Sequence, residues 1–383
     1  MLLQFLTVLR LSEKGGSKTT CPVKADWIFP ARRVTFCVGF EKGFEMRRFH
    51  LFHGRWTRLS VAAGALATVA SMAAQSFAGV VTFGSGTNAF QMEFVTIGNP
   101  NNAADTTGTP NPAGAVAYEY GIGKFEVSED MIDKYNASQP GGILQITKDT
   151  RSAAKPATKV SWNEAARFVN WLNTSTGNQA AYKFTSGGVN DDIELWTAGE
   201  AGYDVNNTYR NSLAKYVLPS HNEWYKAAYY NPTNSTYYVY ANGSNTRPTA
   251  VTSGTTENTA VYNQSREANP NGPADVDQAG GLSPYGVMGL GGNVREFDES
   301  PFDLVAASSG SSSRGIRGGG WRNNSSDLSS SHRIFHDRKN EEFDVGFRVV
   351  SLSSSSPVPE PSSLVIGTLF GLGGLLAKRR MKR

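Results

Sequence analysis

Apolar residues recur with helical spacing in three segments of the chain. Two of these segments begin with a capping box, formed by Ser161 and Glu164 in one and by Ser220 and Glu223 in the other. Apolar positions then repeat every three or four residues, which is the spacing of one buried helical face. The pattern therefore predicts three helices, within residues 127–138, 160–177 and 218–232.

The other apolar runs are short, and they are rich in β-branched and aromatic residues. They are separated by long stretches of Gly, Asn, Ser and Thr, which favour turns and loops. Few helices among many short strands indicate an α+β fold, not a barrel or a doubly wound sheet. The strand-like runs are residues 92–97, 116–127, 214–219, 315–319 and 346–350.

The region before residue 79 has the pattern of a secretory signal. Residues 46–78 contain four arginines, an apolar, Ala-rich run at 59–72, and a small-x-small cleavage site at Ser76–Ala78. A mitochondrial presequence or a membrane anchor is the alternative, but the apolar run is short for a membrane span. We expect Met46 to be the true start, and residues 1–45 to be a disordered upstream over-read.

The C-terminal region has the pattern of a second targeting signal. A polar linker, 351–357, precedes an apolar run at 364–377 and a basic tail, 378–383. With Pro359, Glu360 and Pro361 ahead of the run, this arrangement resembles the PEP-CTERM sorting signal of Gram-negative bacteria. The resemblance, over residues 358–383, implies transient membrane anchoring, processing by an exosortase, and delivery to the cell surface or extracellular matrix.

Charge and cysteine content change once these two ends are set aside. Residues 79–377 hold 21 Lys and Arg against 29 Asp and Glu, so this part is acidic although the whole chain is basic. An acidic domain lacks the electrostatic basis for a nucleic-acid partner. The two cysteines, Cys21 and Cys37, both precede the secretory signal. The exported part therefore has no disulfide.

Residues 79–350 are long enough for one large domain with a substantial core. Their motifs, in chain order, resemble the sulfatase-modifying-factor, or formylglycine-generating-enzyme, family. The resemblance covers residues 92–350 and implies a variant C-type-lectin-like fold. It rests on YGIGKFEVSEDMIDKYN (120–136), the segment 156–172, YVLPSHNEWYKAAYY (216–230), SPYGVMGLGGNVREF (283–297), RGIRGGGW (314–321) and VGFRVV (345–350).

Several large residues in these motifs are expected to be structural. Gly318, Gly319 and Gly320 would let the backbone approach closely beneath a large ring. The arginines beside glycine are expected to form buried ion pairs, and the tryptophans to anchor the core instead of stacking on sugars. The residues are Trp162, Trp171, Trp224, Trp321, Arg317 and Arg348.

The family resemblance also raises a question of catalysis. Active formylglycine-generating enzymes carry two copper-binding cysteines a few residues after the GGSW element. Asn323 and Leu328 occupy the corresponding positions here, and neither supplies a thiolate. We therefore expect no copper and no oxidation of sulfatase cysteines.

Calcium is the metal that the resemblance implies. The carbonyls of Gly292 and Val294 and the carboxylate of Glu296 are the expected ligands, and Asn263 would begin a second site. A buried salt bridge between Glu296 and an arginine is the alternative. The sequence departs from the family at Gly289, where a side-chain oxygen is usual, and at Arg295 and Phe297, where tryptophans are usual.

Other polar groups give weaker hypotheses. His332 and His336, with Asp337, have the spacing of a metal pair if the segment is helical. His221 is expected at the surface. The acidic cluster of Asp191, Asp192 and Glu194 is expected to be a solvated loop.

Two classes of function remain after these exclusions. The first is an exported binding or structural module, whose polar loops, such as residues 234–245, contact exopolysaccharide or a surface protein. The second is a cysteine-independent enzyme acting on exported peptide or polysaccharide. The state of the cleft near Trp321 distinguishes the two classes of function. An open cleft lined by polar groups favours the enzyme, and a filled cleft favours the binding module.

Overall fold

A computed structural model of the chain describes residues 23–29, 32–38, 78–108, 110–265, 272–305 and 309–352. The chain divides into two units, Met1–Ser71 and Met72–Arg383. In the first unit the described residues form one antiparallel hairpin of β1 (Val23–Phe29) and β2 (Arg32–Val38). The hairpin has a physical basis, since both segments are rich in β-branched and aromatic residues.

The second unit contains a five-stranded sheet in which every neighbouring pair is antiparallel. Alternate residues of the long strand β4, such as Phe90, Met92 and Phe94, are buried. The order is β3 (Gly79–Phe83), β4 (Phe90–Ile97), β5 (Tyr120–Gly123), β17 (Val350–Ser351) and β8 (Tyr216–Val217).

A four-stranded sheet forms the second layer of strands. Two of its three strand pairs are antiparallel, and the last pair in the order is parallel. The order is β15 (Ile334–His336), β14 (Arg314–Arg317), β13 (Arg295–Pro301) and β16 (Val345–Gly346). The run expected as one strand at 346–350 is thus divided, because Phe347–Val349 pass from this sheet to the five-stranded one.

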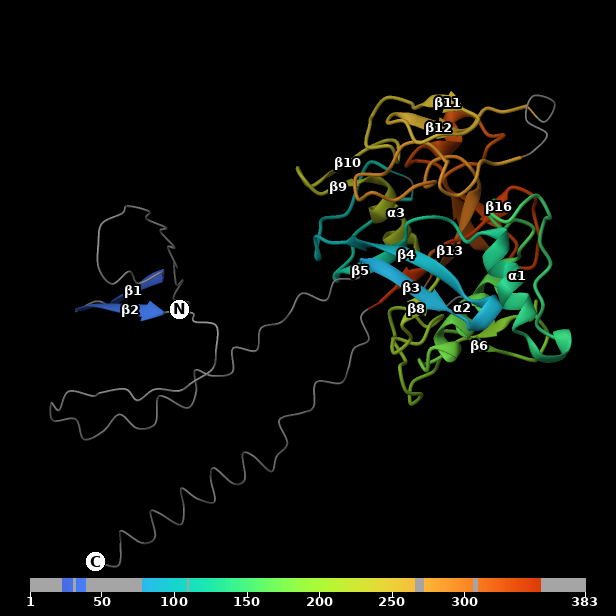
Figure 1. Ribbon diagram of the computed structural model, residues 1–383, viewed down its shortest axis with the longest axis horizontal. Helices are drawn as coiled ribbons and strands as arrows, with labels where there is room; N and C mark the ends of the chain where they lie inside the picture. Colours follow the sequence, from blue (N-terminus) through green and yellow to red (C-terminus); the bar gives the residue numbers. More distant parts are fainter. Residues whose placement is uncertain are drawn as a thin grey trace, which may run out of the picture. The chain divides into compact units, whose positions relative to one another are not determined.

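Smaller elements complete the domain, and Figure 1 shows β11 and β12 at the opposite end from β6. Two-stranded pairs are formed by β6 (Lys183–Phe184) with β7 (Ile193–Glu194), β9 (Tyr230–Asn231) with β10 (Thr236–Tyr237), and β11 (Thr249–Val251) with β12 (Thr259–Val261). Short 3-10 helices lie at Gly86–Asn88, Pro140–Gly142 and Ser325–Leu328.

The three expected helices are confirmed, as are their N-caps. Ser161 and Ser220 each accept a hydrogen bond from the backbone N–H three residues later, and both capping boxes are complete. Ser128 caps the remaining helix. The helices are α1 (Glu129–Ala137), α2 (Trp162–Ser175) and α3 (His221–Tyr229).

The core contains three of the tryptophans named from the sequence. Trp162 and Trp224 are fully buried, and Trp321 is buried against Val261 and Ala274. Gly318, at φ +87°, lies against the indole of Trp224, so a side chain there would crowd the ring. Within the described residues no helix is long and apolar enough to cross a membrane. The segments 46–77 and 353–383 lie outside the described residues.

Candidate functional site

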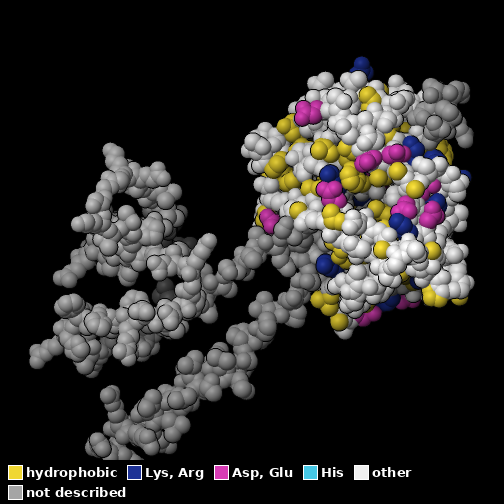
Figure 2. All heavy atoms as spheres, in the orientation of Figure 1, with side chains coloured by type: hydrophobic (Ala, Val, Ile, Leu, Met, Phe, Trp, Pro, Cys, Tyr) yellow, Lys and Arg dark blue, Asp and Glu magenta, His cyan; other side chains and the backbone are white. Residues whose placement is uncertain are grey.

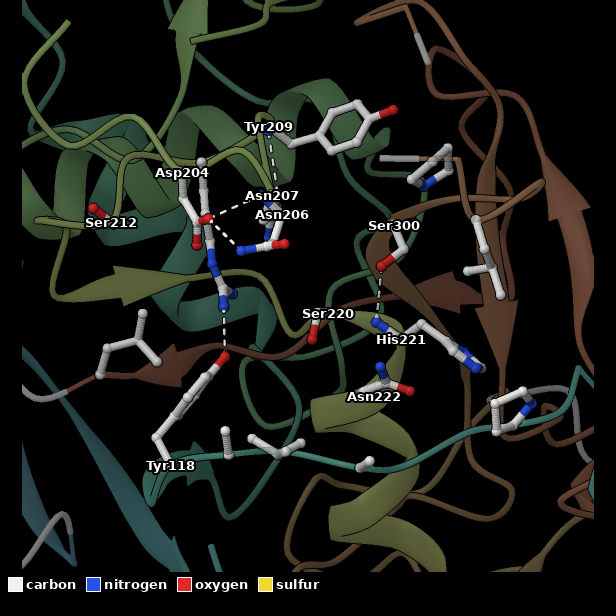
Figure 3. A pocket seen from close by; sticks show the side chains of 18 of the residues that line it. Tyr118, Asp204, Asn206, Asn207, Tyr209, Ser212, Ser220, His221, Asn222 and Ser300 are labelled. Carbon is white, nitrogen blue, oxygen red and sulfur yellow. Dashed lines mark hydrogen bonds between the residues drawn. The ribbon is translucent and has the colours of Figure 1, made fainter. Parts of the chain in front are cut away.

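A pocket in the described part of the chain has a volume of about 610 Å³. Four loops form its wall, and the N-terminus of α3 and the end of β13 lie among them. Figure 3 shows Tyr118, Asp204, Asn206 and Ser212 on one side, and Ser220, His221, Asn222 and Ser300 on the other. The remaining lining residues are Pro112, Ala115, Val116, Ala117, Glu119, Asn207, Tyr209, Arg210, Pro301, Leu304 and Leu352.

A buried ion pair supports the Tyr118 side of the pocket. Arg210 contacts both carboxylate oxygens of Glu223, with its Nη1 3.0 Å from Oε2 and its Nη2 2.9 Å from Oε1. The hydroxyl of Tyr118 donates to Oε1 of Glu223 at 2.7 Å and accepts from Arg210 at 3.0 Å. Burial alone would raise the pKa of Glu223, but Arg210 and the Ser220 N–H outweigh burial and lower it. The pair therefore fixes Tyr118 in the wall.

A second carboxylate, Glu299, holds the loop that carries Asn207. Its two oxygens accept hydrogen bonds from Tyr182, at 2.8 Å, and from Asn207 Nδ2, at 2.6 Å. Burial raises the pKa of Glu299, although Arg210 lies 3.6 Å away and opposes the shift. The loop from Asp204 to Ser212 thus has one attachment deep in the core.

His221 lies on the other side of the pocket, at the first position of α3. The expectation that it is exposed was wrong, because the side chain is 3% exposed and packs against Tyr225. Its backbone N–H donates to the hydroxyl of Ser300 at 3.0 Å. This contact joins α3 to the end of β13, and both elements enter the pocket wall.

The contact with Arg317 assigns the proton of the neutral His221 ring to Nε2. Nδ1 lies 3.4 Å from Nε of Arg317, which can only donate, so Nδ1 is the acceptor. Asp298 is 3.8 Å from Nδ1, beyond hydrogen-bond length, and pairs instead with Arg333 at 2.9 and 3.0 Å. Nε2 is buried and has no hydrogen-bond partner within the described residues. Burial lowers the pKa of His221 to about 4, so the ring is neutral at physiological pH.

Arg317 and Arg348 are both buried, and their contacts differ. Arg348 forms a bidentate pair with Glu296 through Nε, at 2.6 Å, and Nη2, at 2.5 Å. Arg317 donates to the carbonyls of Ser330 and His332. Its guanidinium also lies 5.1 Å from the ring centre of Tyr225.

The two positions aligned with the family thiols have structural contacts. The side-chain oxygen of Asn323 accepts a hydrogen bond from the N–H of Gly320 at 2.7 Å. Leu328 is buried in a small cluster with Ala260 and Tyr262. Trp321, at 3% exposure, fills a core position, so the space near it is filled.

The expected calcium residues lie in two places. Glu296 is fully buried, and its carboxylate contacts Arg348 and the indole N–H of Trp224, as the salt-bridge alternative proposed. Gly292 and Val294 precede it directly before β13. Asn263 is exposed, and it lines a separate hollow of about 440 Å³ with Arg247, Tyr262 and Asn324.

The remaining polar hypotheses are resolved by local contacts. His332 lies 3.3 Å from Asp327, while Nδ1 of His336 contacts the Asp337 carbonyl, and β15 makes this segment a strand. No group of three or more His, Cys, Asp or Glu in the described part of the chain is arranged to hold a metal. Asp192 pairs with Arg338, so this part of the acidic cluster is structural.

Sequence reasoning missed most of the pocket. Ser220 and Glu223 were identified only as a helix cap, and the loop 204–212 has no periodic pattern or motif. Residues 234–245, the loop expected to bind, are absent from the pocket wall. One signal in the sequence could have indicated the Arg210–Glu223 ion pair. Arg210 comes shortly before the capping-box glutamate, and a buried carboxylate needs a cation nearby.

The chain was compared with curated proteins and with solved structures. The search of curated proteins returned no match. Solved structures that resemble the chain include Treponema denticola variable protein 1 (18% identity, TM-score 0.47, 71% of this chain and 98% of that one). They also include CarF (19%, 0.47, 68% and 98%) and PvdO from Pseudomonas aeruginosa (16%, 0.45, 71% and 97%).

The family follows from a direct match over most of the chain. Residues 67–352 match the model of the FGE-sulfatase family, described as the sulfatase-modifying factor enzyme 1-like domain. The match includes both large sheets, all three helices and every residue of the pocket wall. The chain therefore belongs to the FGE-sulfatase family.

Proposed function

We propose that this protein is an exported binding module, and that its 610 Å³ pocket binds a polyhydroxylated ligand such as a segment of exopolysaccharide. The observation that carries this proposal is a pocket of ligand size whose wall combines hydrogen-bonding side chains with small apolar patches. Amide and hydroxyl groups can both donate and accept hydrogen bonds, and carboxylates accept them, as neighbouring sugar hydroxyls require.

The rigid support of the wall favours binding. Tyr118 is held by Arg210 and Glu223, and Asn207 is held by Glu299. Side chains that are already ordered lose little conformational entropy when a ligand binds. The charges of the wall favour a neutral ligand. Glu119 and Asp204 lie in the wall, and Arg210 is already paired with Glu223, so a neutral glycan fits better than an acidic one.

Thiol oxidation is not the proposed activity. Asn323 and Leu328 stand at the positions of the family cysteines, and their side chains make structural contacts. The domain between residues 79 and 352 contains no cysteine in its sequence. A copper–thiolate centre therefore has no ligands there.

The destination of the module is proposed from sequence. The signal at 46–78 and the tail with Pro359, Glu360 and Pro361 support export and sorting to the surface or matrix of a Gram-negative bacterium. An exosortase-type enzyme would be the processing partner. A surface polysaccharide or surface protein would then be the partner of the mature domain.

A second candidate is a cysteine-independent enzyme that uses the same pocket. His221 favours it, because this residue lines the wall and its neutral imidazole has a buried Nε2 with no hydrogen-bond partner within the described residues. Its Nδ1 is occupied by Arg317, so the ring is suited to donate a hydrogen bond and poorly suited to act as a base. This geometry makes binding the stronger of the two proposals.

A glycan array separates these candidates. The purified full-length chain is applied to the array, bound protein is measured by fluorescence, and the same glycans are then analysed by mass spectrometry. We expect retained protein on a subset of neutral glycans with no change in their mass. Cleaved or modified glycans would instead support the enzyme, and an array without any binding would contradict the glycan proposal.

A further inference from the structure

Two exposed phenylalanines lie against each other next to the pocket wall. In the described part of residues 79–352, Phe302 and Phe335 are the exposed phenylalanines, at 41% and 66%, and their ring centres are 5.8 Å apart. Phe302 directly follows Pro301, and Pro301 and Leu304 belong to the pocket wall. Single exposed apolar residues are ordinary, whereas exposed apolar groups gathered in one place mark a binding surface.

The place of Phe335 in its sheet shows that the fold does not require this residue. Phe335 is the middle residue of β15, an edge strand, and alternation puts it on the opposite face from His336, which is buried against Phe297. Its partner across the ladder is Gly315, which has no side chain to cover the ring. A polar residue is usual at such a solvent-facing position. The ring therefore adds apolar surface without adding to the core.

A leucine with a strained backbone continues this surface toward the pocket. Leu304 is 37% exposed and has φ +58°, in the left-handed region that bulky residues rarely adopt. Its N–H donates to the carbonyl of Pro301 at 3.0 Å, which closes the turn. The hydroxyl of Tyr209, in the pocket wall, donates to the carbonyl of Val305 at 3.3 Å. Glycine or asparagine would suit this backbone better, so the leucine presents an apolar side chain at the pocket edge although it strains the turn.

A buried arginine holds the turn in place. Arg333 is 8% exposed, and it donates to the carbonyls of Phe302, at 2.7 Å, and Pro301, at 3.1 Å. The same guanidinium pairs with Asp298 and lies 5.3 Å from the ring centre of Phe302. Phe302 is thus ordered before a ligand arrives, which lowers the entropic cost of binding.

The size of this surface suits a sugar ring better than a protein partner. Standard protein interfaces bury about 800 Å² on each partner, from about 20–30 residues. The exposed apolar side chains here are those of Phe302, Leu304, Val305 and Phe335. A pyranose ring whose hydroxyls are equatorial has C–H bonds on its two faces. Such a face packs on an aromatic ring, because the contact removes apolar area from water and directs C–H groups at the negative face of the ring.

We propose that Phe302, Leu304 and Phe335 form a stacking platform, on which the apolar face of a sugar ring packs just outside the pocket. The inference rests on the proposed glycan binding and narrows its ligand. The pocket wall forms hydrogen bonds with one segment of the glycan, and the stacking platform buries a face of a neighbouring sugar. The ligand is therefore a chain long enough to reach from the pocket to the stacking platform, with equatorial hydroxyls on the sugar that lies there.

A size series of one glycan tests the stacking platform. Oligosaccharides from disaccharide to hexasaccharide are prepared from the neutral glycan with the strongest array signal and are titrated calorimetrically into the full-length chain. Wild-type affinity should rise with length until a sugar reaches the platform, and then stay constant. Phe335→Ala should lose this gain, so that the long oligosaccharides bind it about fivefold or more weakly than they bind the wild type.

Further variants separate stacking from a general apolar contact. Phe335→Leu keeps an apolar side chain without a ring, and it should lose affinity for the long oligosaccharides as Phe335→Ala does. Phe335→Trp keeps a ring and should keep the affinity. Ile143→Ala is the matched control, since Ile143 is 73% exposed and is absent from the pocket wall, and its affinities should equal those of the wild type. Thermal unfolding checks that each variant is folded, as expected for substitutions of exposed side chains.

The outcomes separate this inference from the function on which it rests. If no oligosaccharide binds the wild type, glycan binding fails and the stacking platform fails with it. If the wild type binds the series but the long oligosaccharides bind Phe335→Ala equally well, only the platform is overturned. A wild-type chain that is dimeric in sedimentation, beside a monomeric Phe335→Ala variant, would assign this surface to a second copy of the chain and overturn the platform as well.

Discussion

At the scale of single residues, burial determines the behaviour of the polar groups around the pocket. His221 shows this, because its position in the helix cap suggests exposure while its ring is 3% exposed beside Arg317. For Asp298, a buried partner outweighs burial. Burial alone would raise the pKa of its carboxyl, but the pairing with Arg333 lowers it. The sequence contains the residue types but not their partners, since Asp298 and Arg333 are joined only by the pairing of distant strands.

His221 should give the fold a measurable pH dependence. Its pKa is lowered to about 4 in the folded chain, while the unfolded value is near the ordinary one, about 6.5. The unfolded state therefore binds more protons between these values, and stability is lost as pH falls from about 6.5 toward 4. We expect this residue to account for a loss of roughly 3 kcal/mol.

Urea unfolding of the wild type and of His221→Gln at pH 7 and at pH 4.5 measures this contribution. The wild type should lose more free energy of unfolding than the variant over this interval. Equal losses in the two proteins would show that His221 titrates normally.

At the scale of elements, local signals predicted the helices well and the strands poorly. The capping boxes of α2 and α3 are complete in sequence, so both starts could be located within a residue or two. Strands such as β8 and β16 have two residues each, too few for a periodic pattern. The pocket wall consists of loops between these short elements, and therefore it could not be predicted from the sequence.

The capping box of α3 should contribute more to the free energy of unfolding than an ordinary N-cap does. Glu223→Gln removes the partner of buried Arg210, and we expect a loss of roughly 3 kcal/mol in the free energy of unfolding. Ser220→Ala should cost about 1 kcal/mol, as a typical N-cap does. Glu299 stays 3.6 Å from Arg210, which limits the first loss.

Glu164→Gln is the matched control, because Glu164 has the same position in the box of α2. Burial raises its pKa to about 7, and no ion pair within the described residues includes it. Its substitution should be nearly neutral at pH 7. Chemical denaturation of the three variants gives the comparison, and a Glu223→Gln loss no larger than that of Glu164→Gln would refute the supporting role of the pair.

At the scale of the whole molecule, the chain has the fold of its family. The family resemblance was visible in the sequence because its motifs form β13, β14 and the link from β16 to β17, which build the core. Figure 2 shows charged side chains of both signs scattered among uncharged ones on one face of the domain. This face has no concentration of Lys and Arg, in keeping with the acidic balance of residues 79–377.

The absence of thiols predicts a negative result for the best-known family reaction. The full-length chain, incubated with copper and a cysteine-containing sulfatase peptide, should leave that cysteine unchanged. Mass spectrometry of the peptide measures this, with an active formylglycine-generating enzyme as positive control. Conversion of cysteine to formylglycine would show that Asn323 and Leu328 do not define the reactive positions.

The most direct test of the binding proposal compares pocket variants by titration. The oligosaccharide with the strongest array signal is titrated calorimetrically into the wild type, a Tyr118→Ala/Asn206→Ala double variant, and Asn234→Ala as control. Tyr118 and Asn206 line the pocket, whereas Asn234 is exposed in the loop 234–245. We predict that only the double variant loses affinity, by about tenfold or more, since two or more hydrogen bonds are removed. Equal affinity in the wild type and the double variant, or a loss confined to Asn234→Ala, would contradict the account.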